Sequence, residues 1–207
     1  MNDEQGRMDG NAQAPALGCK PDQPPSAGQQ LLQEGLLLLG QGDRTGAAQV
    51  LARARSERDT LLQAHALIES NDLVGSFRNI MGLDCTISPQ DDIFGFFAGH
   101  ASSTNPLRDY LADGWRTLSE LMLLLEAVGQ PLLQTPSVLE FASGHGRFTR
   151  HLVKVLGPSR VTVSDVVPDA VGFAKQTFGV QGFMSASVPE QVQWPRRYGL
   201  VFVLSLF

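Results

Sequence analysis

A glycine-containing turn after an apolar stretch is the first place in this 207-residue sequence where the residue types indicate chemistry. Residues 137–141 are predicted to form a short strand, and Gly144 and Gly146 follow it directly before a helical pattern that begins near Arg147. Glycine in such a turn lets a ligand approach the backbone at the carboxyl end of the strand, where a Cβ would obstruct it. Asp165 ends a second apolar stretch 19 residues after Gly146, close to the interval at which adjacent parallel strands place a carboxylate beside a bound ribose. The spacing therefore predicts a site for a ligand with an adenosine-like sugar.

Other nucleotide and metal motifs are absent or incomplete in the sequence. There is no GxxxxGK[ST] loop, which excludes that class of phosphate-binding site. Residues 144–149 lack the third glycine of the dinucleotide fingerprint, which weakens a nicotinamide-dependent oxidoreductase without eliminating it. The two cysteines, Cys19 and Cys85, are far apart and form no CxxC, so we predict neither a disulfide framework nor a zinc knuckle and assign no metal site.

Residues 138–146 resemble the first strand and turn of the class I S-adenosylmethionine-dependent methyltransferases, in which an acid and three spaced glycines follow apolar residues. The resemblance implies S-adenosylmethionine as the cofactor, with Glu140 near its methionine amino group, Asp165 at the ribose hydroxyls and Val166 beside the adenine. Residues 198–204 look like the family's fourth strand, and the helix at 110–115 looks like a lead-in over the cofactor. The cofactor-binding residues implied by the resemblance are Glu140, Ala142, Ser143, Gly144, Gly146, Arg147, Asp165, Val166 and Ser187.

Several positions depart from the family pattern. Ala142 replaces the first glycine, where a methyl group is expected to fit at small cost. Ser187 stands where many members carry an aspartate that contacts the adenine amino group, and Gly199 replaces an acid that often opens the fourth strand. The family sheet has seven strands in the order 3-2-1-4-5-7-6, whereas this sequence stops after the fourth. We therefore expect a fragment or truncated product, or else a partner chain or the N-terminal helices that cover the apolar fourth strand.

The elements that must position these residues form a β-α-β-α-β-β pattern. Strands are predicted at 137–141, 160–164, 182–185 and 199–204, with helices that begin near 147 and span 168–178. This order predicts an α/β fold with a Rossmann-like, doubly wound parallel sheet, of which residues 136–207 supply only the first four strands.

The N-terminal half is predicted to be helical after a disordered tail at residues 1–28, which are rich in Pro, Gly and Gln. Residues 29–70 resemble one tetratricopeptide unit, with one helix ending at Gly40 and a second that continues from Ala47 to Ala64. Glu34 and Asp59 depart from that pattern. Because a single unit cannot bury its own face, we favour a hairpin that packs on its own domain or on a second subunit over a peptide-binding repeat.

Residues 71–135 are predicted to form a helical lead-in or lid that includes a long helix at 107–128. For the aromatic patch at 93–97 we favour a place in the core or in the lid over a role in a substrate-binding cage. Asp91, Asp92 and His100 are weak candidates for a general base from a lid, and we expect His145 to be a solvent-facing loop residue. Basic residues on the helix after the glycine turn are expected to form a solvated face, although the first of them is near enough to the loop to meet a carboxylate: Arg147, Arg150, His151 and Lys154.

The composition of the sequence argues against two classes of partner, nucleic acids and membranes. Sixteen basic against 21 acidic residues give a formal charge of −5, which argues against a nucleic-acid partner. The sequence contains no apolar run of membrane-spanning length and no secretory signal, so we expect a cytoplasmic protein without a membrane partner.

The leading hypothesis is a methyltransferase with no assigned catalytic residue that acts on a small molecule or a sugar hydroxyl. One alternative is a truncated or degenerate interaction module, which pairs with itself or with another protein through the N-terminal helices or the sheet edge. A weaker alternative is the nicotinamide-dependent oxidoreductase.

Overall fold

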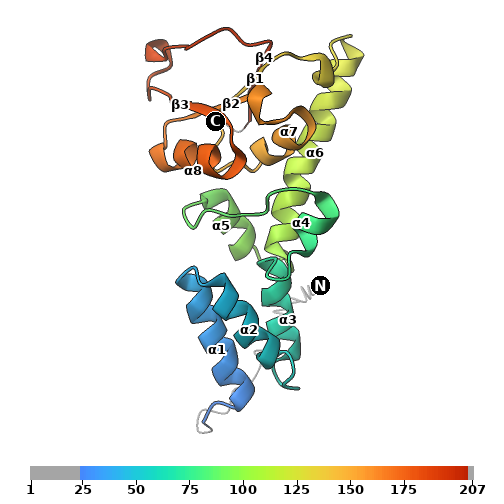
Figure 1. The fold of residues 1–207 in the computed structure, drawn as a ribbon, viewed down its shortest axis with the longest axis vertical. Helices are drawn as coiled ribbons and strands as arrows, with labels where there is room; N and C mark the ends of the chain where they lie inside the picture. The colour runs from blue at the N-terminus through green and yellow to red at the C-terminus, as the bar shows by residue number, and fades with distance from the viewer. Residues whose placement is uncertain (1–23, 205–207) are drawn as a thin grey trace, which may run out of the picture.

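The apolar stretches of the C-terminal third form a four-stranded parallel sheet in the computed structural model of the chain, which describes residues 24–204 (Figure 1). The strands are β1 (Val138–Phe141), β2 (Val161–Asp165), β3 (Gln181–Met184) and β4 (Leu200–Val203), in the order β3-β2-β1-β4. Val138 of β1 lies opposite Val161 of β2 and Leu200 of β4. The predicted α/β class and parallel sheet are therefore confirmed, and each strand boundary lies within one residue of the one expected.

Three helices pack against one face of this sheet. They are α6 (Pro106–Ala127), α7 (Thr149–Leu156) and α8 (Pro168–Phe178). The Asn105 side chain caps the first turn of α6, and Pro106 follows where a helix tolerates proline best. The core between helices and sheet is apolar and well buried, and it contains Leu118, Leu121, Leu132, Val138, Phe148, Leu152, Leu156, Val161, Val163, Ala174, Phe178 and Val180.

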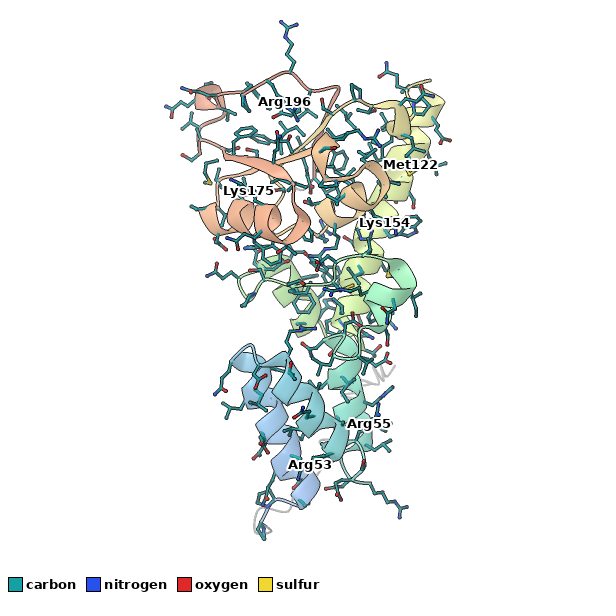
Figure 2. The ribbon with its side chains drawn as sticks, viewed as in Figure 1. Arg53, Arg55, Met122, Lys154, Lys175 and Arg196 are labelled. Carbon is teal, nitrogen blue, oxygen red and sulfur yellow. The ribbon has the colours of Figure 1, made fainter. Side chains whose placement is uncertain are left out.

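The opposite face of the sheet is covered by the irregular link at residues 185–199 (Figure 1). The Trp194 ring lies 5.7 Å from the Phe141 ring, and Arg196 Nη2 donates a hydrogen bond to Thr162 Oγ1 at 3.0 Å. Figure 2 shows Arg196 in this layer above the strands. The link contains the short 3-10 helix η3 (Pro189–Gln191), and the turns elsewhere around the sheet contain η1 (Leu132–Gln134) and η2 (Pro158–Arg160).

A helical arm precedes the sheet and lies at the other end of the molecule (Figure 1). It consists of α1 (Ala27–Gly40), α2 (Arg44–Ala54) and α3 (Leu61–Ser70). α1 and α2 approach closely because position 35 is glycine, where a Cβ would lie 2.5 Å from Leu51 Cδ2. Arg53 and Arg55, near the end of α2, lie far from Arg196 of the link (Figure 2).

The arm differs from the predicted hairpin in two ways. The expected long second helix is two helices, because the chain turns between Ala54 and Leu61, where Thr60 Oγ1 donates to the Ala54 carbonyl at 2.8 Å. α1 begins at Ala27, with Ser26 and Gln29 forming a reciprocal cap, so the end of the expected disordered tail is helical. Residues 1–23 of that tail, including Cys19, lie outside the described residues.

Two short helices connect the arm to the sheet, α4 (Ser76–Met81) and α5 (Asp92–Gly99). Phe94 and Phe97 of α5 pack edge-on against Tyr110 of α6, with ring centroids 5.5 and 6.0 Å apart, whereas Phe96 is exposed. The aromatic patch therefore contributes mainly to a second core, with Leu83, Cys85, Leu107, Tyr110 and Leu111.

Within residues 24–204 the sheet has two edge strands, β3 and β4, and β4 pairs with β1 on one side. Val201 and Val203 are 46% and 43% exposed. The helical arm lies at the opposite end of the molecule (Figure 1), so the expectation that the N-terminal helices cover this strand is wrong. Across the same residues, every helix is too short or too polar to cross a membrane.

Candidate functional site

A cavity of about 350 Å³ lies at the carboxyl edge of β1 and β2, within the size range of small-molecule sites. One side of it is lined by Glu140 of β1, by the first four residues of the glycine loop (142–146) and by Asp165 at the end of β2. Residues 90–93, at the start of α5, line another. The site is thus shared between the parallel sheet and the lead-in region, and the carboxyl ends of parallel strands are where α/β proteins bind ligands.

Glu140 is a buried acid of β1 that lines this cavity. Thr149 Oγ1 of α7 donates a hydrogen bond to Glu140 Oε2 at 2.6 Å. Burial raises the pKa of Glu140 to about 8, although the Thr149 hydrogen bond and the nearby Arg147 charge oppose this shift. At neutral pH the carboxyl group therefore holds a proton, which it would give up when a cationic group binds beside it.

Asp165 ties the glycine loop to the end of β2. Its Oδ2 accepts a hydrogen bond from the Gly144 amide at 2.7 Å, and its Oδ1 accepts one from the Val167 amide at 3.0 Å. Each carboxylate oxygen can accept a second hydrogen bond, so Asp165 retains acceptor capacity toward the cavity that it lines.

The glycine loop uses left-handed backbone at three positions, Ala142 (φ 59°), Gly144 (φ 53°) and Gly146 (φ 84°). A Cβ on Gly144 would meet nothing within 4 Å, which agrees with its position on the cavity wall. A Cβ on Gly146 would lie 2.4 Å from Phe178 Cε2, so packing against α8, and not a ligand, requires glycine there. Alanine at 142 has a conformational cost, because the left-handed backbone region is roughly 1–2 kcal/mol less favourable for an L-residue than the right-handed one.

Arg147 and His145 are both held by acids from neighbouring helices. Arg147 Nη1 forms an ion pair with Asp113 Oδ2 of α6. His145 is only 7% exposed, because Asp169 Oδ2 of α8 lies 2.7 Å from its Nε2 and the Phe173 ring lies 6.0 Å away. The expectation that His145 faces solvent is therefore wrong.

The structure gathers most, but not all, of the predicted site residues around the cavity. Gly146, Val166 and Ser187 do not line it; Val167 lines it in place of the exposed Val166, and Ser187 is exposed in the link. Ser185 of that link instead bonds to Ser164 of β2 through hydroxyl oxygens 2.5 Å apart. The predicted residues that do line the cavity are Glu140, Ala142, Ser143, Gly144, Arg147 and Asp165.

Gln90, Ile93 and Tyr110 line the cavity without having been predicted to do so, and Asp91 and Asp92 were considered only as a possible lid base. Tyr110 OH donates a hydrogen bond to Asp91 Oδ2 at 2.6 Å, and Asp91 Oδ1 caps α5 by accepting from the Phe94 amide at 3.0 Å. An acid before the apolar run at 93–97 is a helix-start signal, but nothing local indicates which pocket that helix start adjoins. His100, the third residue considered as a lid base, bonds to Ser102 and does not line this cavity.

The basic face predicted on α7 is partly buried, so its interpretation as solvated is wrong for two residues. Arg150 and His151 are 2% and 1% exposed. Arg150 Nη1 donates to the carbonyls of Asp84 and Thr86 at 2.7 and 3.2 Å, and its Nε donates to the Gly146 carbonyl at 3.0 Å. Arg150 thereby ties the glycine loop to the segment that leads into α5. Burial lowers the pKa of His151 to about 4, so this imidazole is neutral.

No protein-family model, no curated protein and no solved structure matches the chain. The functional argument therefore depends on the geometry and the charges of the cavity.

Proposed function

We propose that the α/β part of the chain is the cofactor-binding part of an S-adenosylmethionine-dependent methyltransferase. The main support is that Glu140, the glycine loop and Asp165 line one cavity at the carboxyl edge of a parallel sheet. In this proposal Asp165 accepts hydrogen bonds from the ribose hydroxyls, and Glu140 lies near the amino group of the methionine part. The open side of Gly144 gives the cofactor its close approach to the backbone.

The charges of the cavity favour this cofactor over a dinucleotide. Arg147 is the one Lys or Arg among the described residues that line the cavity, and its guanidinium is already paired with Asp113. A pyrophosphate would find acids there and no free cation. S-adenosylmethionine carries a sulfonium and an ammonium group and no phosphate, so it complements the carboxyl groups of Glu140 and Asp165.

The cofactor supplies an activated methyl group, and the protein's task is to hold donor and acceptor in line while water is excluded. The acidic start of α5 borders the cavity, so we propose that the acceptor enters between α5 and the glycine loop. A small molecule or a sugar hydroxyl is the proposed acceptor class.

Calorimetric titration of the purified 207-residue chain with S-adenosylhomocysteine tests the proposal. We expect a dissociation constant on the order of 10 µM for the parent. Asp165→Asn should weaken the affinity at least about tenfold, equivalent to about 1.4 kcal/mol. Circular dichroism must show that the variant is folded, because Asp165 also holds the loop. Glu126→Gln, an exposed acid at the far end of α6, is the matched control and should bind like the parent.

Two results would contradict the proposal. Failure of the folded chain to bind S-adenosylhomocysteine favours the interaction-module alternative. Binding of a nicotinamide dinucleotide in its place favours the oxidoreductase.

A further inference from the structure

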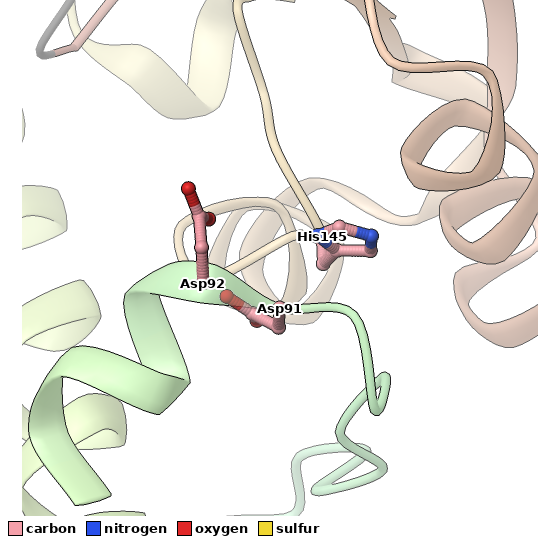
Figure 3. Close-up of side chains that lie close together, drawn as sticks. All are labelled: Asp91, Asp92 and His145. Carbon is pink, nitrogen blue, oxygen red and sulfur yellow. The ribbon is translucent and has the colours of Figure 1, made fainter. Parts of the chain in front are cut away.

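Two acids of the lead-in region lie beside the histidine of the glycine loop, although they are more than 50 residues apart in the sequence. One ligand atom from each of Asp91, Asp92 and His145 lies within 4.8 Å of the others. Figure 3 shows both aspartates at the start of α5 next to the His145 ring. All three residues line the cavity described above, so the cluster faces a space that a ligand can enter.

The His145 ring is oriented as a ligand-binding imidazole would be. Its side chain is only 6% exposed, and Asp169 Oδ2 lies 2.7 Å from Nε2. With a proton on Nε2 donated to Asp169, the lone pair resides on Nδ1, which has no hydrogen-bond partner among residues 24–204. A histidine that binds a metal usually donates its other ring N–H to a carboxylate in this way. The buried ring therefore has one unpartnered nitrogen, and it belongs to a cluster with Asp91 and Asp92 at the start of α5.

The carboxylates of the cluster retain room for a cation. Asp91 accepts one hydrogen bond on each oxygen, from Tyr110 OH and from the Phe94 amide, which leaves a second lone pair on each. Asp92 is exposed and accepts a hydrogen bond only from the adjacent Ile93 amide among the described residues. Asp169 adds a third acid, and the nearby Arg147 is paired with Asp113. Three acids around one imidazole without a free basic side chain favour a bound cation.

We propose that Asp91, Asp92 and His145 bind one divalent transition-metal ion, with Asp169 as the positioning residue of the histidine. A mixed set of carboxylate oxygens and one imidazole suits Mn²⁺ or Zn²⁺ better than Mg²⁺, which prefers oxygen ligands alone. Ligand atoms at about 2.1 Å from an ion lie no more than about 4.2 Å apart, so a small side-chain rotation is required. The exposed side chain of Asp92 is free to make it.

The ion would lie at the proposed entrance for the acceptor, where it would select molecules that offer oxygen ligands. This selection rests on the proposed methyltransferase function, whereas the binding of the ion does not.

Electron paramagnetic resonance of Mn²⁺ tests the site on the full 207-residue chain after treatment with a chelator, without cofactor. We expect one Mn²⁺ per chain, seen as loss of the free-ion signal, and release of that Mn²⁺ by added Zn²⁺. Asp92→Asn and His145→Gln should each weaken binding by about 10- to 100-fold, and Asp169→Asn by about tenfold. Asp92→Asn is the sharpest variant because this exposed residue contributes little to folding; Glu126→Gln is again the matched control.

Absence of stoichiometric Mn²⁺ binding by the folded chain, or unchanged affinity in Asp92→Asn, would overturn the site. Titration of the same samples with S-adenosylhomocysteine separates the two proposals. Mn²⁺ binding without cofactor binding contradicts the proposed function alone, and cofactor binding without Mn²⁺ binding contradicts the metal site alone.

Discussion

Glu140 illustrates how one buried residue links stability to the proposed chemistry. Its carboxyl group lies in β1, where water cannot solvate a charge, and the hydrogen bond from Thr149 does not compensate for that loss. The pKa of Glu140 is therefore raised to about 8, and the group is neutral when the cavity holds no cation. An ammonium group beside it would replace the missing solvation and favour the carboxylate.

The raised pKa of Glu140 predicts a pH dependence of stability. The folded chain retains the proton up to about pH 8, whereas the unfolded chain loses it near the ordinary value of 4.5. Between these values the folded state binds more protons, so the Glu140 contribution to the free energy of unfolding falls as pH rises. The expected fall is on the order of a few kcal/mol, at about 1.4 kcal/mol per pH unit at most. Glu140→Gln, which keeps the shape and removes the titration, should abolish it.

Urea unfolding of both proteins between pH 5 and 9 measures this effect, with the difference between the two curves isolating Glu140. Glu126→Gln should leave the parent's pH dependence unchanged. Parallel curves for the parent and Glu140→Gln would show that Glu140 is ionised in the folded state and would remove the argument for proton release on cofactor binding.

At the scale of the elements, the two glycines of the loop have different tasks. Gly144 faces open space at the cavity, and Gly146 faces the Phe178 ring of α8. The family pattern treats both as ligand positions, but the structure assigns only the first to the cavity wall.

This difference predicts that the same substitution affects mainly binding at position 144 and mainly stability at position 146. Gly144→Ala should lower the free energy of unfolding by about 1 kcal/mol, from backbone strain alone, while weakening S-adenosylhomocysteine binding at least about tenfold. Gly146→Ala adds a clash with Phe178 to the same strain and should cost about 2–4 kcal/mol of stability. Urea unfolding and calorimetry on both variants provide the comparison. Equal stability losses, or unimpaired binding by Gly144→Ala, would contradict the assignment of Gly144 to the ligand side.

At the scale of the whole molecule, local patterns predicted the sheet but not the contacts that complete the site. Strands and helices of the α/β part follow from short apolar runs, a glycine turn and helix-capping residues, all of which act within a few positions. The break between α2 and α3 was missed because Ala54 and Leu61 are seven residues apart, so the helical spacing of apolar residues stays in phase across the polar residues 55–60. The burial of His145 depends on Asp169 of α8, and the placement of Asp91 beside it depends on how α5 packs on α6. No pattern confined to one segment contains that information.

The environment of Arg150 could not be predicted from its local sequence either. In the sequence it belongs to a run of basic residues that looks solvated, yet its side chain is buried and stacks over the Tyr110 and Phe178 rings at 5.3 and 5.0 Å. Its partners are carbonyl groups of the glycine loop and of residues 84 and 86. Arg150 therefore joins the helical lead-in to the sheet, together with the ion pair between Arg147 and Asp113 of α6.

The exposed edge of the sheet makes a final prediction about the molecule as a whole. Within residues 24–204, β4 pairs only with β1, so its other edge presents unpaired backbone groups beside the exposed side chains of Val201 and Val203. Such an edge is a template for pairing with another chain.

We expect the 207-residue chain to self-associate as its concentration rises, and we expect lysine at both valines to raise the midpoint of association at least about tenfold by charge repulsion. Leu62→Lys, an exposed leucine of α3 on the distant arm, is the control and should leave the midpoint unchanged. Analytical ultracentrifugation from micromolar to millimolar concentration measures all three proteins. An equal shift in the control would locate the association on the arm, and a parent that stays monomeric throughout would contradict the prediction.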